Sequence, residues 1–575
     1  MSRRHASIGL RPPDSSGCGF QPQFAISSVW KHTPSPESDW SLAALWRHLL
    51  LCGICSVTAL FAGCGKPAST TSAAVTPPSI LRLSQRNEPA DLDPALAALP
   101  DEFFIIRALS EGLVSPAPTG QLGGIVPAAA QSWDVSTDGL TYTFHLRPGL
   151  VWSNGEPLTA GDFLGSYRRV LAPATAAPKA SLFYAVKNAR AFVTGALADF
   201  SAVGFAAPDP LTLVVTLERP TPQFLVYAAS GPWIPVNPRV VAHFGRTWTR
   251  PEHYVGNGPF TLAAWQSHQR IVVQKNPRFR DPASVRLDEI DFVAFDSGDT
   301  EDRAYRAGQI DLTMSVPFGK LETYAHERPQ ELHQMPLAET RYLAFNCTRP
   351  PLNDPRVRRA LSLTIDRETI VARILHGGEQ SASRVVPPSL GSAATGPLFD
   401  PALARQLLAE AGYPDGKGFP RLELSTWIAS SPVVEAIQSM WRTELGLDIA
   451  LATREAKVHV AALREGRYDI GFITAIPDVS DALDVLHRFT TGAPDNYAHW
   501  SDPTFDALYA TAATASDNAH QTGALRRAED RLLAEAPVAP LYFNAKHWLM
   551  SPRVHDWHED ALWTRHYLGT FLDAP

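Results

Sequence analysis

The chain contains the stretch 353-NDPRVRRAL-361, which predicts the start of an α-helix. Asp354 is a favoured N-cap residue, and Pro355 suits the first helical position, where its missing N–H is not needed. Apolar residues then recur at helical spacing on one face. The Asp-Pro pair returns at Asp400-Pro401, and Gly412 stands where that second helix should end in a left-handed residue. Helices of ordinary globular type are therefore expected in this half of the chain.

Strand signals lie earlier in the sequence. Residues Thr141–Leu146 alternate large apolar residues with Thr and His, which is typical of a half-buried strand. The segment from Ser132 to Gly139 predicts a partner strand and a turn, and so a hairpin. Ile271–Gln274 and Leu287–Val293 predict two further strands. Helices and strands together indicate a mixed α/β protein.

Residues 47–63 have the composition of a bacterial lipoprotein signal peptide. A short cationic lead precedes an apolar run from Leu49, and Ala62-Gly63 supply the small residues that a signal peptidase needs. Cys64 is then expected to be the lipidated first residue of the exported protein. Phe61 departs from the usual Leu three positions before that cysteine. We therefore expect a protein that lies outside the cytoplasm and is tethered to a membrane by lipid.

The segments on either side of this signal have other expected roles. The apolar run is short for a spanning helix, which needs about 20 residues. Cys52-x-x-Cys55 has redox-motif spacing but lacks a strand–helix context. Residues 1–46 form an N-terminal extension, for which we expect a later translation start, at Val29 or Leu45. Residues 64–79 are small, Pro and hydroxyl residues, and predict a flexible tether.

Composition limits the class of protein. With 575 residues, the chain is longer than one core supports, so two or more lobes are expected. Apart from the cysteines up to Cys64, only Cys347 is present, so we expect no intramolecular disulfide. The formal net charge of −7 offers no surface for following nucleic-acid phosphates, so no nucleic-acid partner is expected.

Motifs for catalysis, metals and nucleotides are missing from the sequence. It contains no H-E-x-x-H, no G-x-S-x-G and no paired C-x-x-C. The glycines of Gly412–Gly418 have the wrong spacing for a phosphate loop, and His145, His253 and His268 lack metal-ligand spacing. We therefore expect no cofactor and no metal, and a capture protein rather than an enzyme. A hydrolase assembled from distant residues stays open on this argument alone.

From about Leu81 to the C-terminus, the sequence resembles the extracytoplasmic solute-binding proteins of peptide ABC importers, the oligopeptide- and dipeptide-binding family 5. The resemblance is carried by segments in the family's order: 88-EPADLDP-94, 141-TYTFHLR-147, 152-WSNGEPLTAGDF-163, 256-GNGPF-260, 306-RAGQID-311, 353-NDPRVRRAL-361 and 407-LLAEAGYPDGKGFP-420.

The resemblance implies an α/β, two-lobed periplasmic-binding-protein type II fold with an extra inserted sub-domain and a ligand cleft closed by a hinge. Lobe I would comprise residues 80–118, 251–340 and 541–575. Residues 119–250 would form the inserted sub-domain, and residues 341–540 would form lobe II.

The same resemblance implies a binding site. In this family an extended peptide pairs as an added strand, and a buried carboxylate meets its ammonium. Asp478 matches that carboxylate, with Asp481 and Asp484 as substitutes. The alternative for Asp478 is a helix N-cap or turn residue. The resemblance further implies that Thr474 and Ile476 offer backbone groups, that Tyr342 borders the cleft or packs in the core, and that Glu88 faces it from lobe I.

The chain also departs from its best-known relatives. Ala456 and Ala475 stand where aromatic residues flank the peptide side chains. Leu463 and Phe472 stand where basic residues meet the peptide C-terminus, although Arg464 is adjacent. Any preference for peptide length therefore does not carry over.

The function implied is capture of oligopeptides and their delivery to the permease subunits of an ABC importer, by a monomer held to the cell membrane or outer membrane by lipid only. A non-peptide solute, such as a nickel chelate, haem or a sugar, is the first alternative, since this fold hosts several ligands. A lipoprotein acting as a peptide sensor or chaperone is the second.

Overall fold

The computed structural model describes residues 78–85, 88–118, 122–391, 399–428, 431–515 and 517–573. All of these residues lie in the compact unit Thr76–Pro575. The expected N-terminal extension, the signal peptide, Cys64 and nearly all of the tether lie outside the described residues.

Three larger sheets organise this unit. The β1 sheet has the strands β1 (Ile80–Gln85), β10 (Glu289–Ala294), β9 (Arg270–Lys275) and β8 (Phe260–Gln266) in that order. The β4 sheet has β4 (Ala130–Val135), β5 (Thr141–Leu146), β7 (Thr212–Thr216) and β6 (Phe205–Asp209). The β11 sheet has β12 (Gln380–Ser381), β16 (Val538–Leu549), β11 (Leu332–Phe345), β15 (Ile470–Ala475), β13 (Glu423–Thr426) and β14 (Ala450–Thr453).

The remaining strands form two-stranded ribbons: β2 (Val114–Pro116) with β3 (Ile125–Pro127), β17 (Val554–His555) with β20 (Phe571–Leu572), and β18 (His558–Glu559) with β19 (Arg565–His566). Helices before the β11 sheet are α1 (Pro100–Leu109), α2 (Ala160–Leu171), α3 (Ala189–Val193), α4 (Phe224–Ala228), α5 (Pro238–Phe244), α6 (Gly298–Arg306) and α7 (Leu321–Glu327). Helices after β11 begins are α8 (Pro355–Leu363), α9 (Arg367–Ile370), α10 (Pro401–Glu410), α11 (Pro432–Leu445), α12 (Ala456–Arg464), α13 (Ala482–His487), α14 (Pro503–Ala513) and α15 (Asn518–Glu535).

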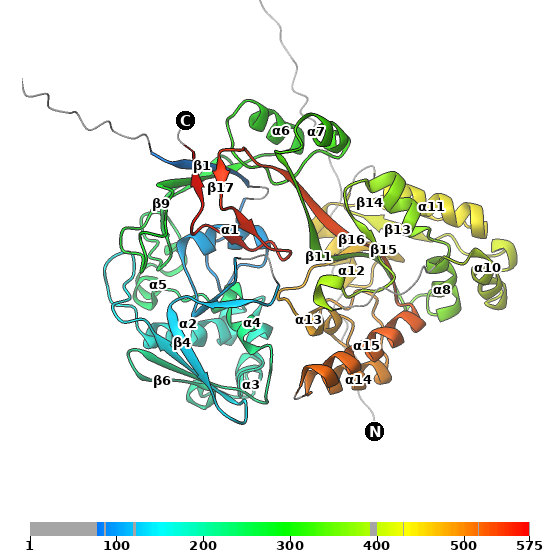
Figure 1. The fold of residues 1–575 in the computed structure, drawn as a ribbon. Coiled ribbons are helices and arrows are strands. Elements are labelled where there is room, and N and C mark those ends of the chain that lie inside the picture. Colours follow the sequence, from blue (N-terminus) through cyan, green and yellow to red (C-terminus); the bar gives the residue numbers. More distant parts are fainter. Residues whose placement is uncertain are drawn as a thin grey trace, which may run out of the picture. The chain divides into compact units, whose positions relative to one another are not determined.

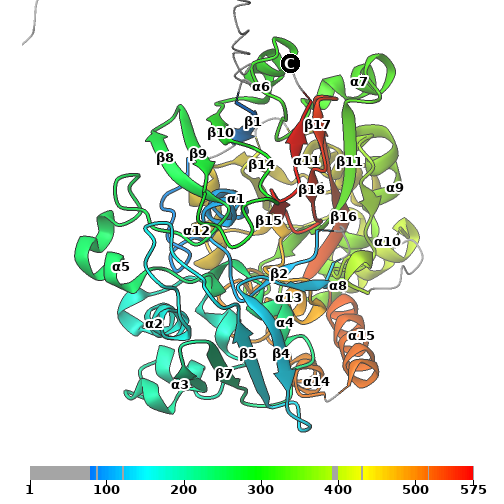
Figure 2. The same cartoon turned by 60° about the vertical axis from the view of Figure 1, so that its left-hand side comes forward.

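The elements predicted from local patterns are confirmed. β4 and β5 pair antiparallel as the expected hairpin, which is visible with β7 in Figure 2. The side chain of Asp354 accepts a hydrogen bond from the Arg356 N–H, and Asp400 caps α10 in the same way. Gly412 has φ +98°, the left-handed value expected after α10. The strand predicted at Leu287–Val293 begins two residues later, as β10.

The GNGPF segment joins α1 to the start of β8 through very close backbone packing. The Gly258 N–H donates to the Leu109 carbonyl at 2.9 Å, and the side chain of Asn257 both donates to and accepts from the backbone of Glu111. A Cβ at Gly256 would lie 2.0 Å from the Leu109 carbonyl oxygen. Glycine is therefore required at this junction, because only it allows the end of α1 to approach.

Asp93 ties the segment before α1 to α2. Its carboxylate is buried and accepts hydrogen bonds from both terminal nitrogens of Arg169. It also accepts from the Ala95 N–H at 2.9 Å. The EPADLDP segment thus ends in a buried ion pair that connects the β1 and β4 sheet regions.

The long strands β11 and β16 pair antiparallel from Leu332–Leu549 to Ala344–Val538, and Figure 1 shows them side by side. Their register shifts between Pro336 and Thr340 and again between Arg341 and Tyr342. The boundaries expected at 340/341 and 540/541 fall inside these two strands. Consequently β11 and β16 are the continuous connection between the region of the β1 sheet and the β11 sheet.

Candidate functional site

The loop between β15 and α13 holds Asp478. Asp481, not Asp478, is the N-cap of α13, because its side chain accepts from the Leu483 N–H at 2.9 Å. The backbone N–H of Asp478 donates to the Asp484 carboxylate at 2.5 Å. These two bonds fix the loop and leave the Asp478 side chain pointing away from the helix, so the alternative of Asp478 as helix N-cap is wrong.

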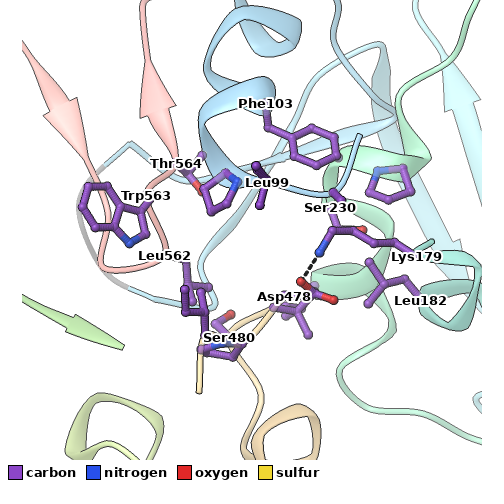
Figure 3. A pocket seen from close by; sticks show the side chains of 18 of the residues that line it. Leu99, Phe103, Lys179, Leu182, Ser230, Asp478, Ser480, Leu562, Trp563 and Thr564 are labelled. Atoms are coloured by element: carbon purple, nitrogen blue, oxygen red, sulfur yellow. Dashed lines mark hydrogen bonds and ion pairs between the residues drawn. The ribbon is translucent and has the colours of Figure 1, made fainter. Parts of the chain in front are cut away.

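A cavity of about 500 Å³ lies beside this loop. Its wall combines α1 and the segments 122–125, 178–182 and 226–232 with α12, the end of β15, the Asp478 loop and residues 560–564. Figure 3 shows that these segments converge on one space. Its volume lies in the range of about 300–1,000 Å³ that is usual for sites of small organic solutes.

Apolar side chains make up much of this wall. Phe103 and Leu99 approach from α1 and its N-cap, and Leu182 and Leu562 lie on other sides (Figure 3). A Cβ at Gly231 would lie 2.0 Å from the Phe103 ring, so the ring takes its place in the wall only because residue 231 is glycine. The wall therefore suits a solute with apolar groups.

Two of the three carboxylates in the cavity wall are ion-paired with cations of the protein. Asp478 forms an ion pair with Lys179, the dashed contact in Figure 3. Asp495 accepts from Arg464 at 3.0 Å. Burial raises the pKa of Asp560, which is opposed by hydrogen bonds that its carboxylate accepts from the Thr564 and Leu562 N–H groups.

Arg488 is the fourth cation of the wall. It donates to the Ile476 carbonyl at 3.0 Å, whereas its Nε is buried and has no hydrogen-bond partner among the described residues. A buried donor that lacks a partner in the described chain, such as Arg488 Nε, is a natural partner for an acceptor on a ligand. Burial lowers the pKa of Arg107, which donates to the Ala229 carbonyl at 3.1 Å.

A cluster of acids stands behind the Asp478 loop. Burial, together with the charge of Asp478, raises the pKa of Asp484 to about 6. Burial also raises the pKa of Asp481, which accepts from the Tyr227 hydroxyl at 2.9 Å. Neither Asp481 nor Asp484 lines the cavity, so the Asp478 side chain is the carboxylate that the loop presents to it.

The structure brings together three of the residues named from the sequence and leaves two elsewhere. Thr474, Ile476 and Asp478 all line the cavity. Tyr342 is 1 % exposed, packs against Phe489 in the core and does not line the cavity. Glu88 accepts from Trp265, Ser267 and the His268 N–H, and so it stabilises the β8–β9 hairpin.

Strand β15 loses its partner strand on one side as it reaches the cavity. On one side β15 pairs with β11 along its full length, up to Thr340–Ala475. On the other side, the ladder to β13 is limited to the Leu424–Ile470 and Ser425–Gly471 pairs. The outer edge of β15 therefore has no strand of the described chain beside it as it approaches Thr474. An extended ligand can pair with an edge of this kind.

Three of the positions at which the chain is expected to depart from its relatives are buried in the core. Leu463, Phe472 and Ala475 are buried, with exposed fractions of 0 %, 0 % and 2 %. Arg464 lines the cavity, so the basic side chain next to Leu463 does reach the site.

Sequence reasoning missed Lys179, Arg488, Arg107 and Trp563. Lys179 precedes the 3-10 turn Ala180–Phe183, whose Phe183 stacks on Trp233 with ring centroids 4.2 Å apart. Nothing in its local sequence points to Asp478, which is 299 positions away. Trp563 is oriented by a 2.6 Å hydrogen bond to Glu339, another long-range contact.

The described residues contain neither a metal site nor a membrane-spanning helix. No group of three or more His, Cys, Asp or Glu side chains in this part of the chain could bind a metal ion. No helix among the described residues is long and apolar enough to cross a membrane.

Known proteins support an assignment. The model of the bacterial extracellular solute-binding proteins, family 5, matches residues 124–497. The probable deoxycholate-binding periplasmic protein YgiS of Escherichia coli is 34 % identical over 523 residues, which cover 88 % of this chain and 95 % of that protein. The periplasmic oligopeptide-binding protein OppA of the same species is 31 % identical over 521 residues, with the same shares.

A solved structure agrees with these matches. The Haemophilus influenzae OppA complex with the peptide RPPGFSPFR has a TM-score of 0.75 and 26 % identity, covering 86 % of this chain and 99 % of that one. The α/β, two-lobed type II fold expected from the resemblance is thereby confirmed. The chain belongs to the family 5 bacterial extracellular solute-binding proteins.

Proposed function

We propose that this protein captures oligopeptides in the cavity beside Asp478 and delivers them to the permease of an ABC importer. The observation that carries this proposal is the convergence of Asp478, Thr474 and the free edge of β15 on one cavity of about 500 Å³. Relatives of the chain are named as periplasmic oligopeptide-binding and murein peptide-binding proteins. Binding without turnover agrees with these relatives, which are binding proteins.

The proposed mechanism uses backbone pairing for affinity. A peptide lying along the outer edge of β15 would pair with backbone groups near Thr474, and Ile476 would contact its side chains. Its ammonium would meet Asp478 in place of Lys179. Apolar side chains of the ligand would lie against Leu99, Phe103 and the rest of the apolar wall. Because backbone is common to all peptides, this mode tolerates many sequences.

We further propose the cellular context that was expected from the sequence. The protein is a monomer outside the cytoplasm, with Cys64 as its lipid anchor, and β11 and β16 act as the hinge between lobe I and lobe II. Lobe I comprises residues 80–118, 251–340 and 541–575, residues 119–250 form its inserted sub-domain, and residues 341–540 form lobe II. The lipid anchor is tested by intact-mass analysis of the membrane-extracted protein, where an unacylated protein that retains the N-terminal segment would contradict it.

A second candidate ligand is an apolar solute that carries a carboxylate. The buried, unpartnered Nε of Arg488 favours an anionic group, and the apolar wall favours a hydrophobic body. The relative YgiS is named as a probable deoxycholate-binding protein, and deoxycholate is an apolar solute with a carboxylate. The test below separates the two candidates.

Native mass spectrometry of the purified chain, followed by denaturation and identification of the released molecules, tests the proposal. A ladder of short peptides is the expected result. We expect Asp478→Ala to keep the fold and lose these peptides, because the exposed fraction of the Asp478 side chain is 35 % and it contributes little to the core. Asp448→Asn, an exposed carboxylate elsewhere, is the matched control. A single non-peptide mass that Asp478→Ala still retains would favour the second candidate instead.

A further inference from the structure

Two carboxylates of the cavity wall, Asp478 and Asp495, are already ion-paired with cations of the protein. Its charged residues among those described are four cations, Arg107, Lys179, Arg464 and Arg488, and three carboxylates, Asp478, Asp495 and Asp560. Asp478 and Asp495 are each paired with one of these cations, whereas Asp560 accepts from the backbone N–H groups of Leu562 and Thr564. A ligand ammonium that binds Asp478 must therefore displace its protein cation or share the carboxylate with it.

Lys179 is the cation that such an ammonium would have to displace from Asp478. Its backbone is fixed, since the Lys179 carbonyl accepts from the Leu182 N–H at 3.1 Å and the turn that follows is buried against Trp233. Its side chain is 18 % exposed and runs along the cavity wall to Asp478 (Figure 3). A lysine ammonium and a peptide α-ammonium have the same charge and the same donors, so they compete for one carboxylate.

Asp478 has little capacity for two cations. Its neighbour Asp484 is engaged by the Asp478 N–H and lies outside the cavity wall. Arg488 adds positive charge on the same side, beneath the Ile476 carbonyl. Two ammonium groups at Asp478 would therefore leave uncompensated positive charge in a partly enclosed site, which is costly.

We propose that Lys179 is a specificity-determining residue: it is an internal counterion that competes for Asp478 and so lowers the affinity for peptides with a free amino terminus relative to peptides whose terminus is blocked. This inference rests on the proposed function, since it concerns peptides in the same cavity. Within the proposed peptide ligands, it assigns to Lys179 the role of weakening the contact between Asp478 and a free α-ammonium.

The test compares two probes on the purified full chain. The protein is unfolded in guanidinium, dialysed and refolded, so that retained solutes are removed. The probes are a mixed tripeptide library with free amino termini and the same library after N-acetylation. Affinities are measured by native mass spectrometry for the wild type, Lys179→Met, Lys179→Gln and the control Lys187→Met, which removes an exposed lysine of the same region.

In the expected result, Lys179→Met and Lys179→Gln bind the free peptides about tenfold more tightly than the wild type does, the worth of one charge-assisted hydrogen bond. Binding of the acetylated peptides stays unchanged, and Lys187→Met matches the wild type. The wild type itself binds the acetylated library at least as tightly as the free one, a result that requires no variant to fold.

Two kinds of outcome would overturn the inference, and they are distinguishable. A wild type that prefers free peptides by tenfold, or Lys179 variants with an unchanged ratio between the two libraries, would overturn it and leave peptide capture standing. Failure of the wild type and of every variant to bind either library would overturn peptide capture itself, and this inference with it.

Discussion

Tyr342 shows how burial separates a packing role from a binding role. Its hydroxyl is buried and has no hydrogen-bond partner among the described residues, and burial raises the pKa of Tyr342. A buried hydroxyl of this kind contributes nothing by hydrogen bonding and costs desolvation. Its ring packs against Phe489. Of the two roles expected for Tyr342, beside the cleft or in the core, the burial of its side chain favours the core.

We therefore predict that Tyr342→Phe keeps or raises the free energy of unfolding, by up to about 1 kcal/mol, and does not change solute affinity. Tyr468→Phe is the matched control. Tyr468 lies in the same core, but its hydroxyl donates to the Tyr497 carbonyl, so its loss should cost about 1 kcal/mol. Urea unfolding followed by tryptophan fluorescence measures both. A tenfold loss of affinity in folded Tyr342→Phe would contradict this prediction and return Tyr342 to the cleft.

At the scale of the elements, the loop between β15 and α13 should make stability depend on pH. Burial holds the pKa of Asp484 at about 6 in the folded protein, against 3.8 for an ordinary Asp. Between these values the folded state binds the proton more tightly than the unfolded state does. The contribution of Asp484 to stability is therefore lost as pH rises from about 4 to about 6. Asp478, Asp481 and Arg488 are the charged groups that act on it.

Asp484→Asn is accordingly predicted to be more stable than the wild type above pH 6, with the difference shrinking towards zero near pH 4. The free energy of unfolding of the two proteins, measured across this range, gives the difference directly and cancels the titration of other groups. Asp448→Asn, whose carboxylate is exposed, should follow the wild type throughout. A constant difference from pH 4 to pH 8 would show that Asp484 does not titrate in this window.

Local patterns predicted the elements well because their causes are local. The N-cap residue of α8, Asp354, accepts a hydrogen bond from an N–H only two residues away. The alternating side chains of β5 have one face buried, as the alternating sequence predicts. The same patterns named Asp478 as a possible cap, since a carboxylate before a helix looks alike at 478 and 481. Only the backbone conformation decides between the two positions, and it places Asp481 at the cap.

The site depends on contacts that no local pattern encodes. Lys179 and Asp478 are separated by 299 positions, and Trp563 and Glu339 by 224. The resemblance supplied Asp478, because the family pattern of the sequence names a carboxylate in this segment. It could not supply Lys179, which lies in a segment outside every motif that carried the resemblance.

At the scale of the whole described unit, a group of hydrogen bonds outside the cavity joins the segment after β7 to the helices after β15. The Arg219 side chain donates to the Ala513 carbonyl at 2.9 Å, and the Tyr227 hydroxyl donates to Asp481 at 2.9 Å. Gln223 and Gln521 are hydrogen bonded between them. None of these side chains lines the cavity beside Asp478. In the proposed division of the chain, Arg219, Gln223 and Tyr227 belong to the inserted sub-domain, and their partners belong to lobe II.

These contacts should stabilise the closed cleft without touching the solute. If the two sides separate when solute leaves, the bonds of Arg219 and Tyr227 exist only in the closed form, and they favour the bound state by population shift. Removing both with Arg219→Ala and Tyr227→Phe should weaken solute affinity about tenfold or more, at roughly 0.5–1.5 kcal/mol for each bond. The loss should appear mainly as faster dissociation.

Stopped-flow displacement of a bound fluorescent peptide measures this dissociation rate. Thr221→Ala is the matched control: Thr221 lies between the two residues, but its hydroxyl donates only to the Arg219 carbonyl within the same segment. The control should dissociate at the wild-type rate, whereas the double variant should dissociate about tenfold faster. Equal rates in all three proteins would mean that this group of hydrogen bonds persists when the solute leaves. The segment after β7 would then move together with α13 and α14 when the solute leaves, and the proposed hinge at β11 and β16 would not separate them.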